Sequence, residues 1–368
     1  MTQRSIALPG YEVIVGRGAL HEVGAVAAAR TRAHHYAIVS DERVAPLYAQ
    51  RVRASLALAA PQAKLSLLLV PPGEEHKTRE LWAQLTDQLL AAGAGRDAAV
   101  IALGGGVVGD LAGFVAATYM RGIPVVQVPT TLLAMVDASV GGKTAVDTPA
   151  GKNLVGAFHP PAAVIADPDT LGTLPLRERR AGLAEVLKHG VVADAAYFAN
   201  VVELLPRLAA EGGAIDPAFT DVVARSVEIK ASVVAEDERE GGRRKILNFG
   251  HTLGHAIELA SGYRLLHGEA IAIGMALEAE IAERMQLADR GTTAHIRDAL
   301  LAAGLQPDFP HRLDARAVLG ATRSDKKARA GAVEYALPTR IGAMAPAEGR
   351  WSVPVADDIV LAVLGAGE

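Results

Sequence analysis

The first part of the chain alternates short apolar runs with segments whose apolar residues recur at helical spacing, such as Leu81–Ala92. The apolar runs are Tyr36–Ser40, Leu65–Val70, Ala98–Leu103, Pro124–Val128 and Ala163–Ala166. Runs of this length that alternate with helices are typical of the strands of a parallel sheet. The pattern therefore predicts an α/β domain in this part of the chain.

The pattern changes after Pro175. Alanine- and leucine-rich segments with charges at helical spacing take over, and a strand-like run returns only at Val333–Leu337. The predicted helices are Arg177–Val192, Ala218–Glu236, Leu247–Ser261, Glu269–Arg284 and Ala294–Ala303. We therefore predict two domains, an α/β domain over residues 1–175 and a mostly α-helical domain over residues 176–368.

Composition supports this fold class and excludes several kinds of protein. Half of the residues are apolar but only 4% are aromatic, so the core is aliphatic, as in helices packed on a parallel sheet. No uncharged apolar run reaches the roughly 18 residues of a membrane span, and the N-terminal residues lack the apolar stretch of a signal peptide. The net charge of −4 argues against general nucleic-acid binding. We expect a soluble, cytoplasmic protein.

The absence of cysteine restricts the metal chemistry, because a metal would need histidine and carboxylate ligands. His251 and His255 are four residues apart and project from one helix face, a familiar spacing for metal ligands. His267 follows in a turn that opens the next helix. Spacing alone therefore nominates His251 with His255. It does not choose the carboxylate, and the residues that qualify are Glu185, Glu258 and Glu269.

A glycine-rich turn follows the predicted strand Ala98–Leu103. Gly104, Gly106 and Gly109 fit the pattern G-x-G-x-x-G, and a helical stretch follows them. Glycines at these places let backbone N–H groups approach a phosphate at the N-terminus of a helix. The turn therefore indicates a nucleotide site.

One part of the usual dinucleotide-binding pattern is missing. An acidic residue should end the next strand and hold the ribose, but Val128 is followed by Pro-Thr-Thr. Asp41 and Glu74 follow earlier predicted strands and lie where open α/β sheets bind ligands. Asp110 would repel a phosphate, so it should face a neutral or cationic group.

Two lysines lie shortly after the glycine-rich turn. Lys143 and Lys152 each occupy a glycine-containing turn with polar neighbours. Short lysine-bearing loops of this kind suit an anionic small molecule.

Several long blocks of sequence carry a resemblance to one enzyme family. They are, in order, GGGVVGDLAGFVAATYMRGIPVVQVPTTLLAMVDASVGGKTAVDTPAGKNLVGAFHPP, AGLAEVLKHG, KILNFGHTLGHAIE, LLHGEAIAIGM and SDKK. This series resembles the 3-dehydroquinate synthase family over about residues 40–340. The resemblance implies an NAD-binding, Rossmann-like α/β domain, then a helical metal-binding domain, with the active site between them and a homodimer as the assembly.

The resemblance also implies a role for individual residues. It assigns Zn²⁺ or Co²⁺ to Glu185, His251 and His267, and makes His255 a catalytic residue that faces the substrate. The NAD contacts it implies are Asp41, Glu74, Lys77, Gly105, Gly106, Asp110, Thr130, Thr131 and Thr173, with Lys143 and Lys152 beside them. The substrate contacts it implies are Arg121, Asp137, Lys143, Lys152, Asn153, Lys188, Lys230, Arg244, Asn248 and one of Lys326 and Lys327.

The activity that the resemblance implies is a carbon–oxygen lyase reaction of the shikimate pathway. It converts 3-deoxy-D-arabino-heptulosonate 7-phosphate, a phosphorylated sugar acid, to 3-dehydroquinate and phosphate. The steps are transient oxidation by NAD, phosphate elimination, re-reduction, ring opening and intramolecular aldol closure. The reaction is redox-neutral, so NAD should stay bound.

Three other interpretations stay open at this point. A sister sugar-phosphate cyclase would make a valiolone- or inosose-type ring, but Asn248 and His255 match the dehydroquinate-forming pattern. A metal-dependent polyol dehydrogenase has a similar glycine turn, but the lysine-bearing loops and SDKK favour a phosphorylated acid. A non-catalytic binding protein would not need every metal, NAD and substrate position to hold the expected residue type.

Overall fold

The computed structural model describes residues 3–212, 215–323, 328–329, 332–346 and 350–365. The chain divides into two compact units, residues 1–174 with 219–231 and residues 175–218 with 232–368. The first break lies one residue from the predicted boundary, but residues 219–231 join the first unit. They belong to helix α7 (Ala218–Glu236), where Lys230 donates a hydrogen bond to Asp137 of that unit. Sequence periodicity cannot reveal such a long-range contact.

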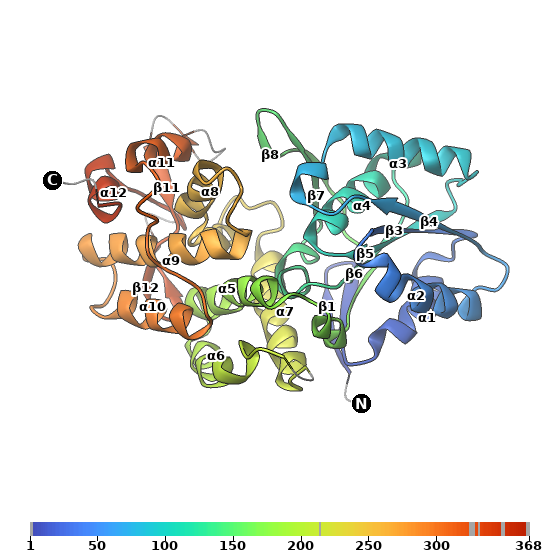
Figure 1. Ribbon diagram of the computed structural model, residues 1–368, viewed down its shortest axis with the longest axis horizontal. Coiled ribbons are helices and arrows are strands. Elements are labelled where there is room, and N and C mark those ends of the chain that lie inside the picture. The colour runs from blue at the N-terminus through green and yellow to red at the C-terminus, as the bar shows by residue number, and fades with distance from the viewer. Residues whose placement is uncertain (1–2, 213–214, 324–327, 330–331, 347–349, 366–368) are drawn as a thin grey trace. The chain divides into compact units, whose positions relative to one another are not determined.

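A seven-stranded sheet forms the centre of the first unit (Figure 1). Its strands, in spatial order, are β1 (Arg4–Leu8), β2 (Tyr11–Val15), β9 (Ala163–Ala166), β6 (Val125–Pro129), β5 (Ala98–Gly104), β3 (His35–Asp41) and β4 (Lys64–Val70). Only β1 and β2 pair antiparallel, and all other neighbours are parallel. The predicted parallel α/β fold is confirmed, whereas β1 and β2 were not predicted.

The helices of this unit cover the two faces of the sheet. They are α1 (Val23–Thr31), α2 (Ala45–Ala59), α3 (Arg79–Ala91) and α4 (Gly106–Thr118). Alternate residues of β3 enter different cores, with Ala37 and Val39 in the cluster of α3 and α4 and Tyr36 and Ile38 in that of α1 and α2. Because both faces of β3, β5, β6 and β9 are buried, these strands are almost continuously apolar, which is why the sequence revealed them. The edge strand β4 is also apolar, although Leu67 and Leu69 are exposed.

The predicted lysine-bearing loops are wrong in one respect. Lys143 opens strand β7 (Lys143–Thr148) and Lys152 lies in strand β8 (Gly151–Phe158), and these two strands pair as an antiparallel hairpin. The glycines that suggested loops lie at the ends of the strands, where Gly142 and Gly151 adopt positive φ. The pairing of the intervening residues makes strands of what the sequence suggested were turns.

The second unit is mainly helical, as predicted. Its helices are α5 (Leu176–Ala193), α6 (Ala195–Leu208), the end of α7, α8 (His251–Ala260), α9 (His267–Arg284), α10 (Thr292–Ala302), α11 (Ala315–Thr322) and α12 (Asp357–Val363). Short strands accompany them, namely β10 (Ala328–Arg329), β11 (Ala332–Tyr335), β12 (Pro338–Arg340), β13 (Ala343–Met344) and β14 (Val353–Pro354).

Helix α8 begins later than the predicted helix Leu247–Ser261. Gly250 has a φ of 78°, which interrupts helical geometry, and residues Arg243–Asn248 form the 3₁₀ turn η6 instead. This interruption makes His251 the first residue of α8.

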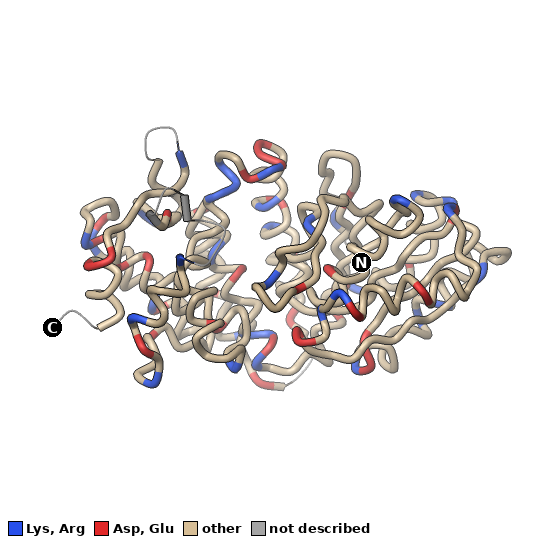
Figure 2. The backbone as a smooth tube through the Cα atoms, turned by 90° about the horizontal axis from the view of Figure 1, so that it is seen from above, with Lys and Arg blue, Asp and Glu red and all other residues tan. Residues whose placement is uncertain are grey.

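Charges are distributed without strong separation along the described backbone. Figure 2 shows acidic and basic residues intermingled on both units. Within the described ranges, no helix combines the length and apolar character that a membrane crossing needs.

Candidate metal centre and active site

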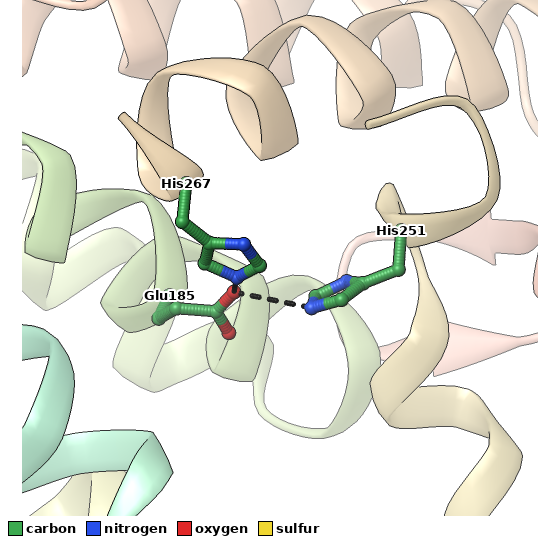
Figure 3. A group of neighbouring side chains, drawn as sticks. All are labelled: Glu185, His251 and His267. Atoms are coloured by element: carbon green, nitrogen blue, oxygen red, sulfur yellow. Dashed lines mark ion pairs between the residues drawn. The ribbon is translucent and has the colours of Figure 1, made fainter. Parts of the chain in front are cut away.

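Three side chains of the second unit converge on one point (Figure 3). Glu185 comes from α5, His251 from the first residue of α8 and His267 from the first residue of α9. Their ligand atoms all lie within 4.8 Å of one another. The Nε2 atoms of His251 and His267 are 3.5 Å and 3.7 Å from Oε1 of the fully buried Glu185. The group therefore presents two imidazole nitrogens and one carboxylate oxygen to a common point.

The opposite ring nitrogens have partners that orient both histidines. Nδ1 of His251 donates to the backbone oxygen of Phe249 at 3.1 Å, and Nδ1 of His267 faces Oε2 of Glu258 at 3.5 Å. Partners of this kind are typical around metal-ligating histidines, because they aim the other nitrogen at the metal. The donor set fits Zn²⁺ or Co²⁺ held by three protein ligands with a further position open, as in catalytic sites.

A second group could also hold a metal, and it consists of His255, Glu258 and His267. Each of the two groups contains only one of His251 and His255. The pair nominated by the i, i+4 spacing is therefore not brought into one group, although its rings lie 5.2 Å apart between centroids. The i, i+4 spacing places His251 and His255 on one face of α8, but Glu185 and His267 come from the neighbouring helices α5 and α9.

Glu269 has other partners, which explains why the third carboxylate is absent from both groups. It forms an ion pair with Arg177 at 2.6 Å and accepts a hydrogen bond from the backbone N–H of Leu266 at 2.8 Å. Glu269 thus caps the start of α9.

The electrostatic setting of His267 favours its protonated form in the metal-free chain. Burial by itself lowers the pKa of this imidazole, but the facing carboxylates of Glu185 and Glu258 outweigh burial and raise the pKa to about 9. A metal ion would have to displace this proton, so metal binding at this site releases protons.

Other predicted residues of the second unit lie on α5 and η6. Lys188, which is 1% exposed, forms an ion pair with Oε2 of Glu185 one helical turn away. Asn248 donates to Oε1 of Glu240 at 2.6 Å, and the backbone N–H of Arg244 donates to Asp237 at 3.0 Å. Lys326 and Lys327 lie outside the described residues.

The glycine-rich turn of the first unit forms as predicted. Gly104 ends β5, and Gly106 begins α4. An added Cβ at Gly105 would lie 3.1 Å from the side chain of Thr131, so the turn is closely packed. The N–H of Thr130 donates to the oxygen of Gly104 at 2.9 Å. Parallel sheets bind ligands at this edge, beyond the carboxyl ends of the strands.

Asp41 and Thr173 have local partners in the first unit. Asp41 ends β3, and its Oδ1 accepts hydrogen bonds from the N–H groups of Arg43 and Val44 at 2.8 Å and 2.9 Å. The hydroxyl of Thr173 lies 2.6 Å from the hydroxyl of Tyr48.

Lys77 is the centre of a buried charge cluster. Its ammonium group is 3.0 Å from Asp110, 3.1 Å from Glu74 and 3.8 Å from Asp147, and it donates to Oδ1 of Asn153 at 2.7 Å. Burial alone would lower the pKa of Lys77, but the three carboxylates outweigh it and raise that pKa. Asp110 therefore faces a cation, as its place beside a phosphate-type turn required.

Of the remaining predicted residues of the first unit, Lys152 joins this cluster, whereas Arg121 follows the end of α4 that is opposite to the glycine turn. Lys152 lies 3.5 Å from Glu74. Asp137 pairs with the buried Lys230 at 2.7 Å. Arg121 is exposed in the turn after α4, with a φ of 67°.

Sequence reasoning missed two acidic residues of these sites. Asp147 accepts a hydrogen bond from the N–H of Asn153 at 2.9 Å and faces Lys77, and Glu240 faces Asn248. No spacing signal could have found them, because the contact of Asp147 with Lys77 joins distant segments and the contacts with Asn153 and Asn248 form across irregular turns without a regular period. Glu258 was considered as a ligand, and its position behind His267 was not foreseen.

Comparison with known proteins identifies the family. The N-terminal family model of 3-dehydroquinate synthase matches residues 67–181, and the C-terminal model matches residues 182–328. A curated 3-dehydroquinate synthase from Xylella fastidiosa (strain M23) is 48% identical over 341 residues, which covers 91% of each chain.

Solved structures of two related cyclases share the fold. A 2-deoxy-scyllo-inosose synthase complexed with carbaglucose-6-phosphate, NAD⁺ and Co²⁺ has a TM-score of 0.88 and 29% identity, and covers 100% of both chains. The 2-epi-5-epi-valiolone synthase ValA from Streptomyces hygroscopicus subsp. jinggangensis 5008, with NAD⁺ and Zn²⁺ bound, has a TM-score of 0.84 and 29% identity, and covers 99% of this chain and 97% of ValA. With both family models matched in sequence order and nearly half of its residues shared with a curated member, the chain belongs to the 3-dehydroquinate synthase family.

Proposed function

We propose that the chain converts 3-deoxy-D-arabino-heptulosonate 7-phosphate to 3-dehydroquinate and phosphate. The observation that carries this proposal is the convergence of Glu185, His251 and His267 in a member of this family. The fold and the charge cluster around Lys77 agree with an enzyme that also uses NAD. The related cyclases crystallised with NAD⁺ and with Co²⁺ or Zn²⁺ support both cofactors.

The metal and NAD provide the chemistry that side chains lack. A divalent cation held by Glu185, His251 and His267 supplies Lewis-acid polarisation of a substrate hydroxyl, and NAD supplies a hydride acceptor. NAD would lie against the edge of the sheet in the first unit, at the turn of Gly105 and Gly106. Its proposed contacts are Asp41, Glu74, Lys77, Asp110, Thr130, Thr131 and Thr173.

The chain's own residues bind the anionic groups and move one proton. Arg121, Lys152 and Asn153, with one of the lysines at 326 and 327, hold the phosphate, which can itself accept the proton released during its elimination. The residues that hold the carboxylate and hydroxyls are Asp137, Lys143, Lys188, Lys230, Arg244 and Asn248. His255 moves the proton at C5, because imidazole titrates near neutral pH.

The proposed activity is tested by phosphate release under anaerobic conditions with the heptulosonate phosphate, NAD⁺ and Zn²⁺. We expect free phosphate and 3-dehydroquinate with no net NADH. Stoichiometric NADH without phosphate would contradict the proposal and indicate a dehydrogenase. Glucose 6-phosphate and sedoheptulose 7-phosphate serve as comparison substrates. Faster phosphate release from either of them than from the heptulosonate phosphate would indicate a sister cyclase.

We further propose that the enzyme is a cytoplasmic homodimer. Strand β8 has a single partner in its described sheet, β7, and it exposes Leu154, Val155 and Phe158 at 41%, 38% and 53%. An open strand edge with apolar side chains favours pairing with another chain. A second copy of this chain is the partner that the family resemblance implies.

A further inference from the structure

Helix α9 carries a buried acidic residue that the proposed reaction does not use. Glu278 lies in the interior of α9 and is 0% exposed. Its Oε2 accepts a hydrogen bond from the backbone N–H of Gly250 at 2.6 Å, and its Oε1 accepts one from Leu253 at 3.0 Å. Gly250 has no side chain to cap α8, so Glu278 satisfies two N–H groups at the start of that helix from a neighbouring helix.

The peptide group between Phe249 and Gly250 links this carboxylate to a metal ligand. Its N–H points to Glu278, and its oxygen accepts the hydrogen bond from Nδ1 of His251 at 3.1 Å. The other nitrogen of the same ring, Nε2, faces Oε1 of Glu185 at 3.5 Å. A continuous chain of hydrogen bonds therefore runs from Glu278 through one peptide group to His251.

The packing of α8 on α9 keeps this peptide group in place. Gly250 has a φ of 78°, and a Cβ added there would lie 2.5 Å from the side chain of Met275. A Cβ added at Gly274 would lie 2.0 Å from the oxygen of Gly250. The two helices therefore approach closely at these glycines. The oxygen of Gly250 belongs to the next peptide group, so the backbone at Gly250, which joins the two peptide groups, has little room to turn.

We infer that Glu278 is a positioning residue for the metal site, acting on His251 through the peptide group of Phe249 and Gly250. The carboxylate holds the peptide so that its oxygen accepts the Nδ1 proton, which leaves Nε2 as the ligand atom. Hydrogen bonds in series polarise one another, so the negative charge also makes Nε2 a better electron donor. This inference rests on the proposed metal site of Glu185, His251 and His267.

The test compares the metal affinity of Glu278→Gln with that of the wild type. Glutamine preserves the size of the side chain but removes its charge and one acceptor oxygen. We expect Zn²⁺ affinity, measured by competition with a chelator, to fall about tenfold, as is usual when an outer partner of a metal ligand is lost. We also expect the visible absorption bands of the Co²⁺ protein to shift.

Leu300→Ala is the matched control, because it removes a fully buried side chain of α10 in the same unit. It should lower the melting temperature but leave metal affinity and the Co²⁺ spectrum unchanged at temperatures where the protein is folded. Wild-type affinity and spectrum in Glu278→Gln would overturn the inference, as would an equal loss of affinity in Leu300→Ala.

Two further measurements separate this inference from the proposed metal site. If His251→Ala keeps wild-type metal affinity, the metal site itself is wrong. If His251→Ala loses the metal but Glu278→Gln does not, the metal site stands and the role of Glu278 is wrong. Should Glu278→Gln not fold, nitrogen NMR of the wild-type zinc protein decides, because a proton on Nε2 of His251 in place of Nδ1 would overturn the inference.

Discussion

His267 shows how one residue serves both the metal site and the fold. It opens α9, its Nε2 faces Glu185 and its Nδ1 faces Glu258. Two carboxylates on opposite sides of one imidazole stabilise its cation when no metal is present and orient its neutral form when a metal is bound.

Replacing His267 by alanine should abolish metal binding and turnover and leave NAD binding intact. The reason is that the substitution removes one of three ligands, whereas the proposed NAD residues lie in the other unit. Metal content by elemental analysis and NAD titration by fluorescence measure the two effects. His295→Ala, on α10, is the control that should keep the metal. Full zinc content in His267→Ala would refute the assignment.

The metal-free protein should lose stability between about pH 6.5 and pH 9. The folded-state pKa of His267 is raised to about 9 from 6.5, so the folded chain holds the proton more tightly than the unfolded chain. The resulting stability is complete below about pH 6.5 and is lost as the pH rises through 9, with a slope of at most about 1.4 kcal/mol per pH unit. Chemical denaturation over this range, with chelator present, measures it. His267→Asn should remove the slope, and an unchanged slope in that variant would exclude His267 as its origin.

Lys77→Met should destabilise the first unit and weaken NAD binding. The substitution leaves Asp110, Glu74 and Asp147 without the cation they share, and breaking a buried ion pair on one side costs about 3 kcal/mol. Urea denaturation and NAD titration check this prediction. Lys64→Met, in strand β4, should change neither by much, since Lys64 is exposed and donates to a backbone oxygen. If Lys77→Met keeps wild-type stability, the three carboxylates do not need the Lys77 ammonium group to be stable in the folded protein.

At the scale of elements, the contact between α8 and α9 decides where the metal ligands stand. α8 begins with His251 and α9 begins with His267, and the two helices approach at Gly250, Gly254 and Gly274. These glycines have a physical role, because a methyl group on any of them would collide with the facing helix.

Gly274→Ala should therefore destabilise the second unit and weaken metal binding. Its Cβ would lie 2.0 Å from the backbone oxygen of Gly250, and overpacking of this kind costs about 3 kcal/mol. Gly320→Ala, inside α11, is the matched control, because its Cβ would meet nothing within 4 Å. That change should raise stability by up to about 1 kcal/mol through helix propensity alone. Calorimetric melting measures the change in stability of each variant. An equal change in Gly274→Ala and Gly320→Ala would contradict the role of close packing at Gly274.

The helices and strands also show which elements the sequence patterns predict and which they do not. All five predicted strands are present. Four of them are buried parallel strands, which are apolar along most of their length, and the fifth, the edge strand β4, has the same apolar run although part of it is exposed. Strands β1 and β2 and the β7–β8 hairpin were missed, since their pairing depends on partners and turns and not on an apolar run. Helix α8 begins at His251 and not at Leu247 because Gly250 takes a positive φ, which periodicity does not reveal.

At the scale of the whole molecule, the proposed function needs two units with different chemistry. The first has the glycine turn and the Lys77 cluster, and the second has the histidine and carboxylate group. Assembly is a further property at this scale, and the open edge of β8 is its proposed origin.

Phe158→Asp should shift the protein from dimer to monomer. It places a charge on the exposed apolar face of β8, where pairing between copies would bury it. Sedimentation velocity measures the mass in solution. Leu58→Asp, at an 87% exposed position of α2, is the control that should keep the wild-type mass. A dimer that survives Phe158→Asp unchanged would contradict the role of this edge.

The sequence by itself determined the fold class, the family and the chemical type of the metal site. Continuous apolar runs and helical periods are local properties, and a chain without cysteine leaves histidine and carboxylate as ligands. Spacing left the carboxylate open and the family resemblance named Glu185, but only the tertiary structure shows that Glu185, and not Glu269, faces both His251 and His267. It also decided that Lys77 is shared by three carboxylates. Such choices depend on which segments pack together, and a contact between residues far apart in the chain leaves no periodic trace in the sequence.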